Sequence, residues 1–164
     1  MEKYQTIINR IFTPDSISQQ LAYWQFKGKK IAFTNGCFDI LHLGHVEYLS
    51  KAAEMGDILI IGLNTDASVR RLKGDNRPIN SEYARAFLLA SLRFVDAVVF
   101  FDEDTPYNII KGIQPDILVK GNDYKPEDIV GYDIVTAKGG EVKTVELVEG
   151  FSSSLIIEKM ISKK

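Results

Sequence analysis

The sequence is poor in the residues that build disulfides and metal sites. Its 164 residues contain one cysteine and two histidines. One cysteine cannot form an internal disulfide, and such scarcity is typical of the reducing cytoplasm. The N-terminal residues carry no apolar stretch of a secretion signal. The longest strongly apolar run, residues 58–63, is far shorter than the ~20 residues that span a bilayer. We therefore predict a cytoplasmic protein that does not enter a membrane.

No excess of charge of either sign is present. The chain has 20 lysines and arginines against 22 aspartates and glutamates, a net charge of −2. Nucleic-acid and anionic-membrane binding usually require a basic excess, so we expect neither partner. The length suits one domain. Within it we predict an N-terminal helical extension at residues 1–28 and the main domain at residues 29–164.

Beyond residue 28, apolar runs alternate with segments of helical period. Continuous apolar runs between turn residues predict buried strands, and a period of 3.6 predicts helices. Strands are predicted at residues 30–35, 57–63, 96–101, 115–121 and 141–148. Helices are predicted at residues 45–56, 64–72, 80–92, 105–113 and 152–164, with short or broken helix between 126 and 140. This alternation predicts an α/β fold, a Rossmann-like, doubly wound, parallel five-stranded sheet with helices on both faces.

The only cysteine and both histidines fall in one stretch, FTNGCFDILHLGHVEYL at residues 33–49. It follows the first main strand, and ligands of such sheets bind at the carboxyl ends of strands. His42 and His45 are three residues apart where the loop leads into the next predicted helix, and residues at this spacing on a helix face one target. Gly36 permits a sharp turn, and Gly44 lets a ligand approach the backbone. A helix start also favours an anion, so phosphate binding is one interpretation.

Two other interpretations of this stretch stay open from its residues alone. Cys37 and Asp39 could join the histidines around zinc. However, the chain has no further cysteine or histidine, and the spacing matches no zinc pattern, so we expect no metal site in the protein. The histidines could also be a packed pair that is satisfied by local hydrogen bonds.

Several motifs together resemble one superfamily. NGCFDILHLGHVEYL is similar to the signature of cytidylyltransferase-like nucleotidyltransferases, in which Phe-Asp is followed by His-x-Gly-His. EGFSSSLII, residues 149–157, resembles the serine-rich helix start that completes their triphosphate site. RRLKGDNRPIN, SLRFVDAVVF and DILVKGNDYKPEDIVG lie between them in the family's order. The resemblance covers residues 29–161. Within the superfamily, the motifs most specifically resemble the adenylyltransferase domain of the bacterial heptose-phosphate pathway, in its free-standing form.

The resemblance implies transfer of AMP from ATP to D-glycero-β-D-manno-heptose 1-phosphate. The products are pyrophosphate and ADP-heptose, a precursor of the lipopolysaccharide core. Mg²⁺ is expected to be held mainly by the phosphates. A cytidylyltransferase for glycerol 3-phosphate is the alternative, but such relatives carry an arginine before the serines, where this chain has VELVEG. An inactive nucleotide-binding module is disfavoured by the intact motifs, and a tRNA synthetase fragment by the lack of basic charge.

The resemblance also implies residue roles. His42, His45 and Lys73 are expected to act in catalysis, with the nearby triphosphate favouring protonated histidines. The ATP-binding residues are expected to be Asn35, Gly36, Cys37, Phe38, Gly44, Lys120, Gly121, Ser152, Ser153 and Ser154. The residues that contact the sugar phosphate are expected to be Asp39, Arg77, Arg93 and Asp123.

Some residues have alternative or supporting roles in this scheme. Asp39 either binds Mg²⁺ or fixes the loop and His45. Arg85 is a weaker candidate for substrate contact, and Arg70 and Arg71 are expected to be solvated. Cys37 is expected to pack beneath the loop without acting as a catalytic thiol. Apolar residues near the N-terminus suggest a homodimer.

Overall fold

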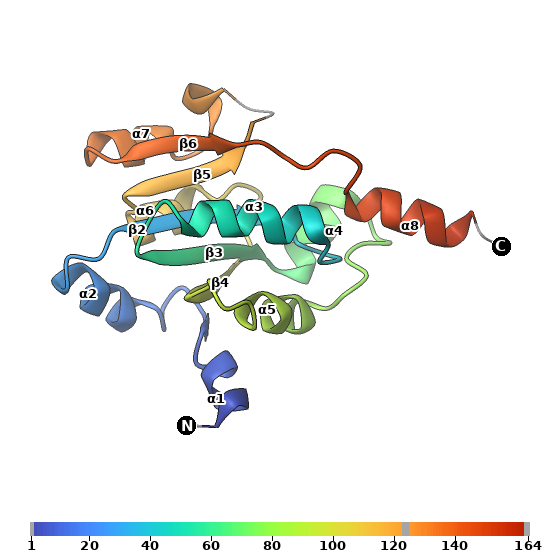
Figure 1. Ribbon diagram of the computed structural model, residues 1–164, viewed down its shortest axis with the longest axis horizontal. Coiled ribbons are helices and arrows are strands. Elements are labelled where there is room, and N and C mark those ends of the chain that lie inside the picture. Colours follow the sequence, from blue (N-terminus) through green and yellow to red (C-terminus); the bar gives the residue numbers. More distant parts are fainter. Residues whose placement is uncertain (1, 123–124, 163–164) are drawn as a thin grey trace.

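A computed structural model describes residues 2–122 and 125–162, and its centre is a parallel sheet (Figure 1). The strands run in the order β1-β4-β3-β2-β5-β6, and every pair is parallel. The strands are β1 (Ile11–Phe12), β2 (Ile31–Gly36), β3 (Ile58–Asn64), β4 (Ala97–Phe101), β5 (Ile117–Gly121) and β6 (Glu141–Val145). The chain builds outward from β2 to β3 and β4, then crosses over to β5 and β6. This reversal confirms the predicted doubly wound α/β sheet.

The predicted number of five strands is wrong, because the sheet has six. The additional strand is β1, which lies within residues 1–28. Ile11 and Phe12 pair with Val98 and Val99 of β4 at the edge of the sheet. Two residues are too few to form a recognisable strand pattern. The N-terminal segment therefore contributes an edge strand to the sheet as well as the helices α1 (Lys3–Ile8) and α2 (Ser18–Phe26).

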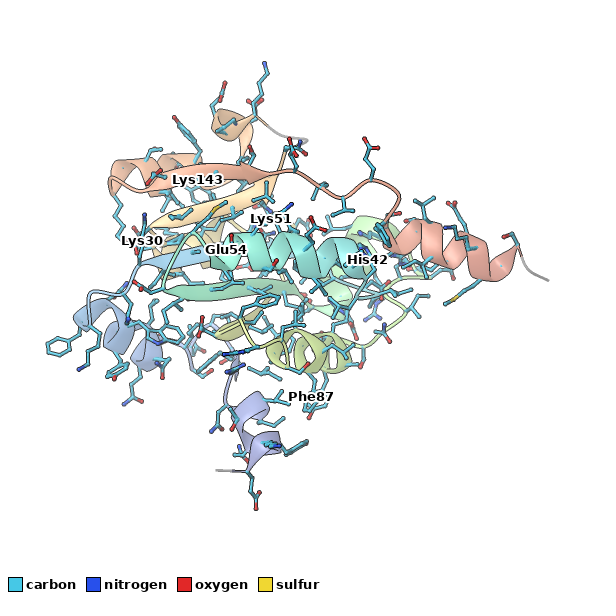
Figure 2. All side chains as sticks on the ribbon, viewed as in Figure 1. Lys30, His42, Lys51, Glu54, Phe87 and Lys143 are labelled. Carbon is cyan, nitrogen blue, oxygen red and sulfur yellow. The ribbon has the colours of Figure 1, made fainter. Side chains whose placement is uncertain are left out.

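Helices cover both faces of the sheet. One face packs against α3 (Leu43–Ala53) and α5 (Glu82–Ala90), and the other against α2, α6 (Tyr107–Ile113) and α7 (Tyr132–Ala137). Phe87 of α5 extends toward α1 and packs against Tyr4, with ring centroids 5.7 Å apart (Figure 2). The shorter elements are α4 (Asp66–Lys73), the 3-10 helix η1 (Pro126–Asp128) and the C-terminal α8 (Ser153–Ile161).

The pattern of β3 shows why this strand was predictable. All seven of its residues are buried. Leu59 and Ile61 pack into the core on the α3 side, whereas Ile58 and Ile60 pack into the core on the α6 side. A strand covered on both faces has few polar positions, so residues 58–63 read as a continuous apolar run that ends at Asn64. Among the described helices, none has the length and apolar character required to traverse a bilayer.

Candidate active site

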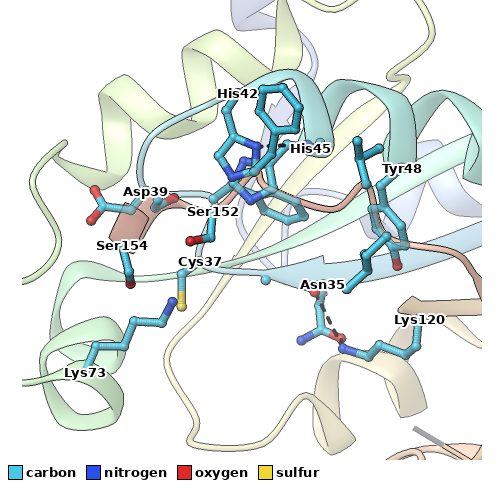
Figure 3. A pocket seen from close by; sticks show the side chains of 17 residues that line it. Asn35, Cys37, Asp39, His42, His45, Tyr48, Lys73, Lys120, Ser152 and Ser154 are labelled. Atoms are coloured by element: carbon cyan, nitrogen blue, oxygen red, sulfur yellow. Dashed lines mark hydrogen bonds between the residues drawn. The ribbon is translucent and has the colours of Figure 1, made fainter. Parts of the chain in front are cut away.

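A cavity of about 400 Å³ opens at the carboxyl ends of the strands (Figure 3). Four segments that are distant in sequence enclose it: the β2–α3 loop with the start of α3, the end of α4, the end of β5, and the β6–α8 connection. The lining residues are Asn35, Gly36, Cys37, Phe38, Asp39, His42, Gly44, His45, Tyr48, Lys73, Lys120, Leu147, Val148, Phe151, Ser152, Ser153 and Ser154. The cavity thus brings together every residue predicted for catalysis or ATP binding except Gly121.

The β2–α3 loop turns sharply at a packed aromatic ring. Phe38 has a φ of 45°, which is unusual for a residue with a side chain, and its ring is buried. A Cβ added to Gly36 would lie 3.0 Å from this ring. A side chain at the end of β2 would therefore push against the Phe38 ring that folds back beneath the loop. The turn leaves the following residues facing the cavity.

The two histidines stack on each other at the start of α3. Their ring centroids are 3.7 Å apart with an angle of 19° between the planes, and Phe38 meets the His45 ring edge-on at 5.1 Å. Nδ1 of His42 caps α3 by accepting a hydrogen bond from the backbone N–H of His45 at 3.3 Å. A neutral His42 therefore carries its proton on Nε2, where it is a hydrogen-bond donor.

Gly44 permits the approach of the C-terminal segment to this pair. A Cβ at Gly44 would lie 3.1 Å from the Cβ of Phe151 and 3.2 Å from the ring of His42. The ring of Phe151 in turn stacks beside that of His42, with centroids 6.4 Å apart. A side chain at this position would push one of these neighbours away. The glycine in His-x-Gly-His thus serves close packing between α3 and the segment before α8.

Burial favours the neutral form of both histidines in the free protein. Burial lowers the pKa of His42, and it is the main cause that lowers the pKa of His45 to about 4. The charges of His42 and Lys73 lower the His45 pKa further, while the backbone of Ile40 partly opposes them. Nδ1 of His45 is buried and has no hydrogen-bond partner of normal geometry within residues 2–122 and 125–162. The protonated histidines predicted beside a triphosphate would therefore have to be formed by the ligand's charge.

Two lysines enter the cavity from opposite sides (Figure 3). Lys73 is the last residue of α4, and its ammonium extends toward Cys37. Lys120 reaches from β5 to Asn35, where it donates to the side-chain oxygen and approaches the backbone oxygen at 3.5 Å. Anionic groups in the cavity would thus lie between two cations. Lys73 is exposed and lines the cavity.

The three serines have different contacts. Ser152 caps α8, because its Oγ accepts from the N–H of Leu155 at 3.1 Å. Ser153 Oγ donates to the carbonyl of Ile40 at 3.3 Å, which ties α8 to the β2–α3 loop. Ser154 is exposed and lines the cavity. Only one serine is used for capping, so the other two are available for the loop and a ligand.

Asp39 bonds through its carboxylate to protein groups other than His45. Its carboxylate is 2% exposed and accepts from Arg77 Nε at 2.7 Å, from the Ile79 N–H at 2.8 Å and from the Asn80 N–H at 3.0 Å. Burial raises the pKa of this carboxyl, but the three hydrogen bonds outweigh burial and hold the pKa below its usual value. Both oxygens are occupied, so Asp39 is unsuited to bind Mg²⁺ in this arrangement.

Arg85 supports the cavity from beneath. Its side chain is fully buried and donates to the carbonyl of Cys37 at 2.7 Å, the carboxylate of Asp66 at 2.7 Å and the carbonyl of Asn80 at 3.1 Å. The sequence suggested substrate contact for Arg85, but every one of these partners belongs to the protein. The guanidinium thus joins the β2–α3 loop, α4 and the segment before α5.

Other predicted residues lie away from the cavity. Arg77 does not line it, because its guanidinium is held by Asp39. Arg93 is exposed in the turn between α5 and β4. This turn lies at the amino end of β4 and the cavity lies at the carboxyl ends of the strands, so the position of Arg93 does not support substrate contact. Arg71 is not simply solvated, because it pairs with Asp104 at 2.9 Å. Asp123 lies outside the described residues.

Four lining residues were not predicted from the sequence: Tyr48, Leu147, Val148 and Phe151. The hydroxyl of Tyr48 lies 2.7 Å from that of Thr34 and donates to the carbonyl of Val119 at 3.0 Å. Tyr48 falls one helical turn after Gly44, so helical spacing from the motif could have identified it. Within the part of the chain that the structure describes, no group of three histidine, cysteine, aspartate or glutamate side chains is arranged to hold a metal ion.

Comparison with known proteins agrees with this geometry. The family model described as cytidylyltransferase-like matches residues 33–159. The chain is 62% identical over 136 residues to "Bifunctional protein HldE" of a Nitratiruptor species, covering 83% of this chain and 29% of that protein. It is 56% identical over 151 residues to the protein of the same name from Wolinella succinogenes, covering 92% and 31%. The chain thus spans about a third of these curated relatives.

A solved structure is also similar. It is described as the lipopolysaccharide core biosynthesis protein from Thermoplasma volcanium. The two chains are 30% identical with a TM-score of 0.58, and the match covers 74% of this chain and 98% of the other. The similarity therefore extends over nearly the whole of that protein and about three quarters of this chain.

Proposed function

Because this chain belongs to the cytidylyltransferase-like family, we propose that it transfers AMP from ATP to D-glycero-β-D-manno-heptose 1-phosphate. The products would be ADP-heptose and pyrophosphate, and the reaction would take place in the cytoplasm. Two similarities support this substrate pair: the high identity to proteins named HldE, and the relative described as a lipopolysaccharide core biosynthesis protein. The motifs from residue 70 to residue 131 support the same choice.

One observation carries the proposal: histidine, lysine and serine donors from four distant segments converge on a single cavity. In the proposed reaction a phosphate oxygen of the sugar phosphate attacks the α-phosphorus of ATP, and the bond to the leaving pyrophosphate breaks. The attacking oxygen is already nucleophilic, so a protein nucleophile is unnecessary. Burial raises the pKa of Cys37, which keeps its thiol protonated and suits a packing role. The protein would act by aligning two anions and by stabilising the charge of the transition state.

The side chains have distinct parts in this mechanism. His42 offers the Nε2 proton to the α-phosphate, and His45 lies stacked against it. Ser154 and the N-terminus of α8 face the β- and γ-phosphates. A helix N-terminus contributes about 0.3–1 kcal/mol, whereas one preorganised donor to a developing oxyanion contributes roughly 10²–10³ in rate. The side-chain donors would therefore provide most of the rate enhancement.

We propose that Mg²⁺ enters with ATP and is held mainly by its phosphates. The carboxylate of Asp39, which lines the cavity, uses both oxygens within the protein. The described residues at the cavity therefore offer no fitting carboxylate ligand, and no step of the proposed mechanism depends on the metal.

The alternative substrates are CTP and glycerol 3-phosphate. Relatives with that specificity carry an arginine shortly before the serine-rich helix. In this chain Leu147 and Val148 line the cavity at that point, and residues 141–152 contain no arginine. The missing cation disfavours this alternative.

The decisive experiment is a pyrophosphate-release assay in which ATP and CTP are each combined with heptose 1-phosphate and with glycerol 3-phosphate. We expect turnover with ATP and heptose 1-phosphate. Turnover with CTP alone would contradict the proposal. A second measurement uses His45→Ala: near-normal turnover at saturating substrates would show that the histidine pair has no catalytic role.

We also propose that the chain is a single domain that forms a homodimer. Large aromatic side chains of the N-terminal helices are exposed, with Tyr4 at 60%, Tyr23 at 56% and Phe26 at 83%. A second copy packed on them would remove apolar surface from water. Light scattering across a concentration series measures the mass, and a constant monomer mass would contradict the dimer.

A further inference from the structure

A second cavity, of about 210 Å³, adjoins the first at the same edge of the sheet. It is enclosed by the β4–α6 connection, by η1 with the residues that follow it, and by β5. Its lining residues are Asp104, Thr105, Pro106, Lys120, Asp128, Ile129 and Val130. Lys120 also lines the first cavity, where its ammonium meets Asn35. The two cavities therefore meet at one cationic side chain.

We propose that the second cavity binds the sugar ring of the acceptor sugar phosphate, with Lys120 at the junction beside the acceptor's phosphate. This inference rests on the proposed function and adds the position at which the acceptor sugar phosphate binds. ATP then occupies the first cavity, and the acceptor phosphate meets its α-phosphate from the side of β5.

The charges of the lining favour a neutral sugar ring over a triphosphate. Asp104 and Asp128 place two carboxylates around the second cavity. Asp104 is paired with Arg71, so the charge that would repel a polyanion is chiefly that of Asp128. Lys73 and the three serines line the first cavity only, and Lys120 lies at the junction of the two. Phosphate groups therefore belong in the first cavity, and only the uncharged part of a substrate suits the second.

Hydrogen-bonding chemistry favours a sugar over adenine. Ionised carboxylates only accept hydrogen bonds. A sugar offers a donor at every hydroxyl, whereas adenine offers one amino group and several ring acceptors. The Thr105 hydroxyl adds a further polar partner, and Pro106, Ile129 and Val130 form an apolar surface for the C–H face of the ring. The cavity is also smaller than the ~300–1,000 Å³ of sites for larger ligands, so it suits a single ring.

The two carboxylates differ in their freedom to bind a ligand. Asp104 is held by Arg71, whose Nε donates to it at 2.9 Å. Asp128 is exposed at the end of η1, and among the described residues no side chain pairs with its carboxylate. Asp128 is therefore the side chain best placed to accept from a sugar hydroxyl. Glu127, its neighbour in η1, is also exposed but does not line the cavity.

Asp128 and Glu127 provide a matched test of the proposal. Asp128→Asn and Glu127→Gln each remove one negative charge from the same short helix. A hydrogen bond to a charged group corresponds to roughly a 10- to 100-fold change in affinity. We expect Asp128→Asn to raise the KM for heptose 1-phosphate by about tenfold or more, with the KM for ATP unchanged. Glu127→Gln should leave both KM values at the wild-type level.

A second variant tests the volume of the cavity. Val130 is 38% exposed, so Val130→Trp can extend into the space without displacing the core. We expect the KM for heptose 1-phosphate to rise and the KM for ATP to stay constant, in protein whose melting temperature matches that of the wild type.

The outcomes separate this inference from the proposed function. A wild-type protein that does not turn over heptose 1-phosphate overturns both. With wild-type turnover established, a higher KM for ATP in the two variants would place the nucleoside in the second cavity and overturn the assignment. Unchanged KM values for both substrates in both variants would also overturn it.

Discussion

Nucleotide binding should make His45 take up a proton. In the free protein the pKa of His45 is lowered to about 4, chiefly by burial. A triphosphate beside the ring would stabilise the imidazolium and return the pKa toward its ordinary value of 6.5. At pH 6.0, a group with a pKa of about 4 is protonated in about 1% of molecules, and one with a pKa of 6.5 in about 75%. The shift corresponds to about 3 kcal/mol of added interaction with the charged form.

Isothermal titration calorimetry with α,β-methylene ATP at pH 6.0 measures this uptake. Titrations in two buffers of different ionisation enthalpy give the number of protons exchanged. The nucleotide's own phosphate also titrates, so the quantity of interest is the difference between the wild type and His45→Asn. We expect the wild type to take up about 0.7 proton more. A difference near zero would refute the view that the ligand protonates His45.

The lowered pKa of His45 also makes the free energy of unfolding depend on pH, and this dependence serves as a control. The folded-state pKa of His45 lies below its ordinary value, so the neutral form stabilises the fold above about pH 6.5. This contribution, at most about 3 kcal/mol, is lost as the pH falls from about 6.5 to about 4. Denaturant unfolding at several pH values should show a smaller acid-dependent loss for His45→Asn than for the wild type.

Three further substitutions test the support of the site. Arg85→Met should lower the free energy of unfolding by about 3–5 kcal/mol, measured in urea, because it leaves Asp66 without its buried partner. Asp39→Asn should lower it by about 1–3 kcal/mol, because an amide cannot accept from all three donors; an unchanged value would contradict the hydrogen bonds described. Gly44→Ala should change the melting temperature little, since alanine favours helix by about 1 kcal/mol. It should still lower kcat/KM at least tenfold, because the new methyl group would displace His42.

The sheet was predictable wherever burial leaves a clear pattern. Continuous apolar runs located β2 and β3, and their order relative to the helices predicted the parallel, doubly wound arrangement. β1 was missed because two residues carry no pattern, and its pairing with β4 depends on a contact across more than eighty positions of sequence. An edge strand of this kind is determined by tertiary packing.

Most residues that line the cavity could be predicted from the sequence, but the residues that hold the lining in place could not. Glycines, histidines and serines at the ends of elements identified the residues that face it. For Asp39, Arg77 and Arg85, the sequence shows a charge near the motif but does not show whether its partner is a ligand or the protein. The structure pairs all three with protein groups. Spacing along the chain cannot distinguish these cases, because most of the partners are distant in sequence.

These internal contacts explain how a loop without a strong base could serve phosphoryl chemistry. Arg85 holds the carbonyl of Cys37, Ser153 holds the carbonyl of Ile40, and the carboxylate of Asp39 is held by Arg77 and by nearby backbone N–H groups. The β2–α3 loop is thus secured from three directions before any substrate is bound. Donors that are fixed in advance require no reorganisation as charge develops, which is the source of their large effect on rate. In the proposed reaction Asp39, Arg77 and Arg85 would therefore act through the loop they hold rather than by touching the phosphates.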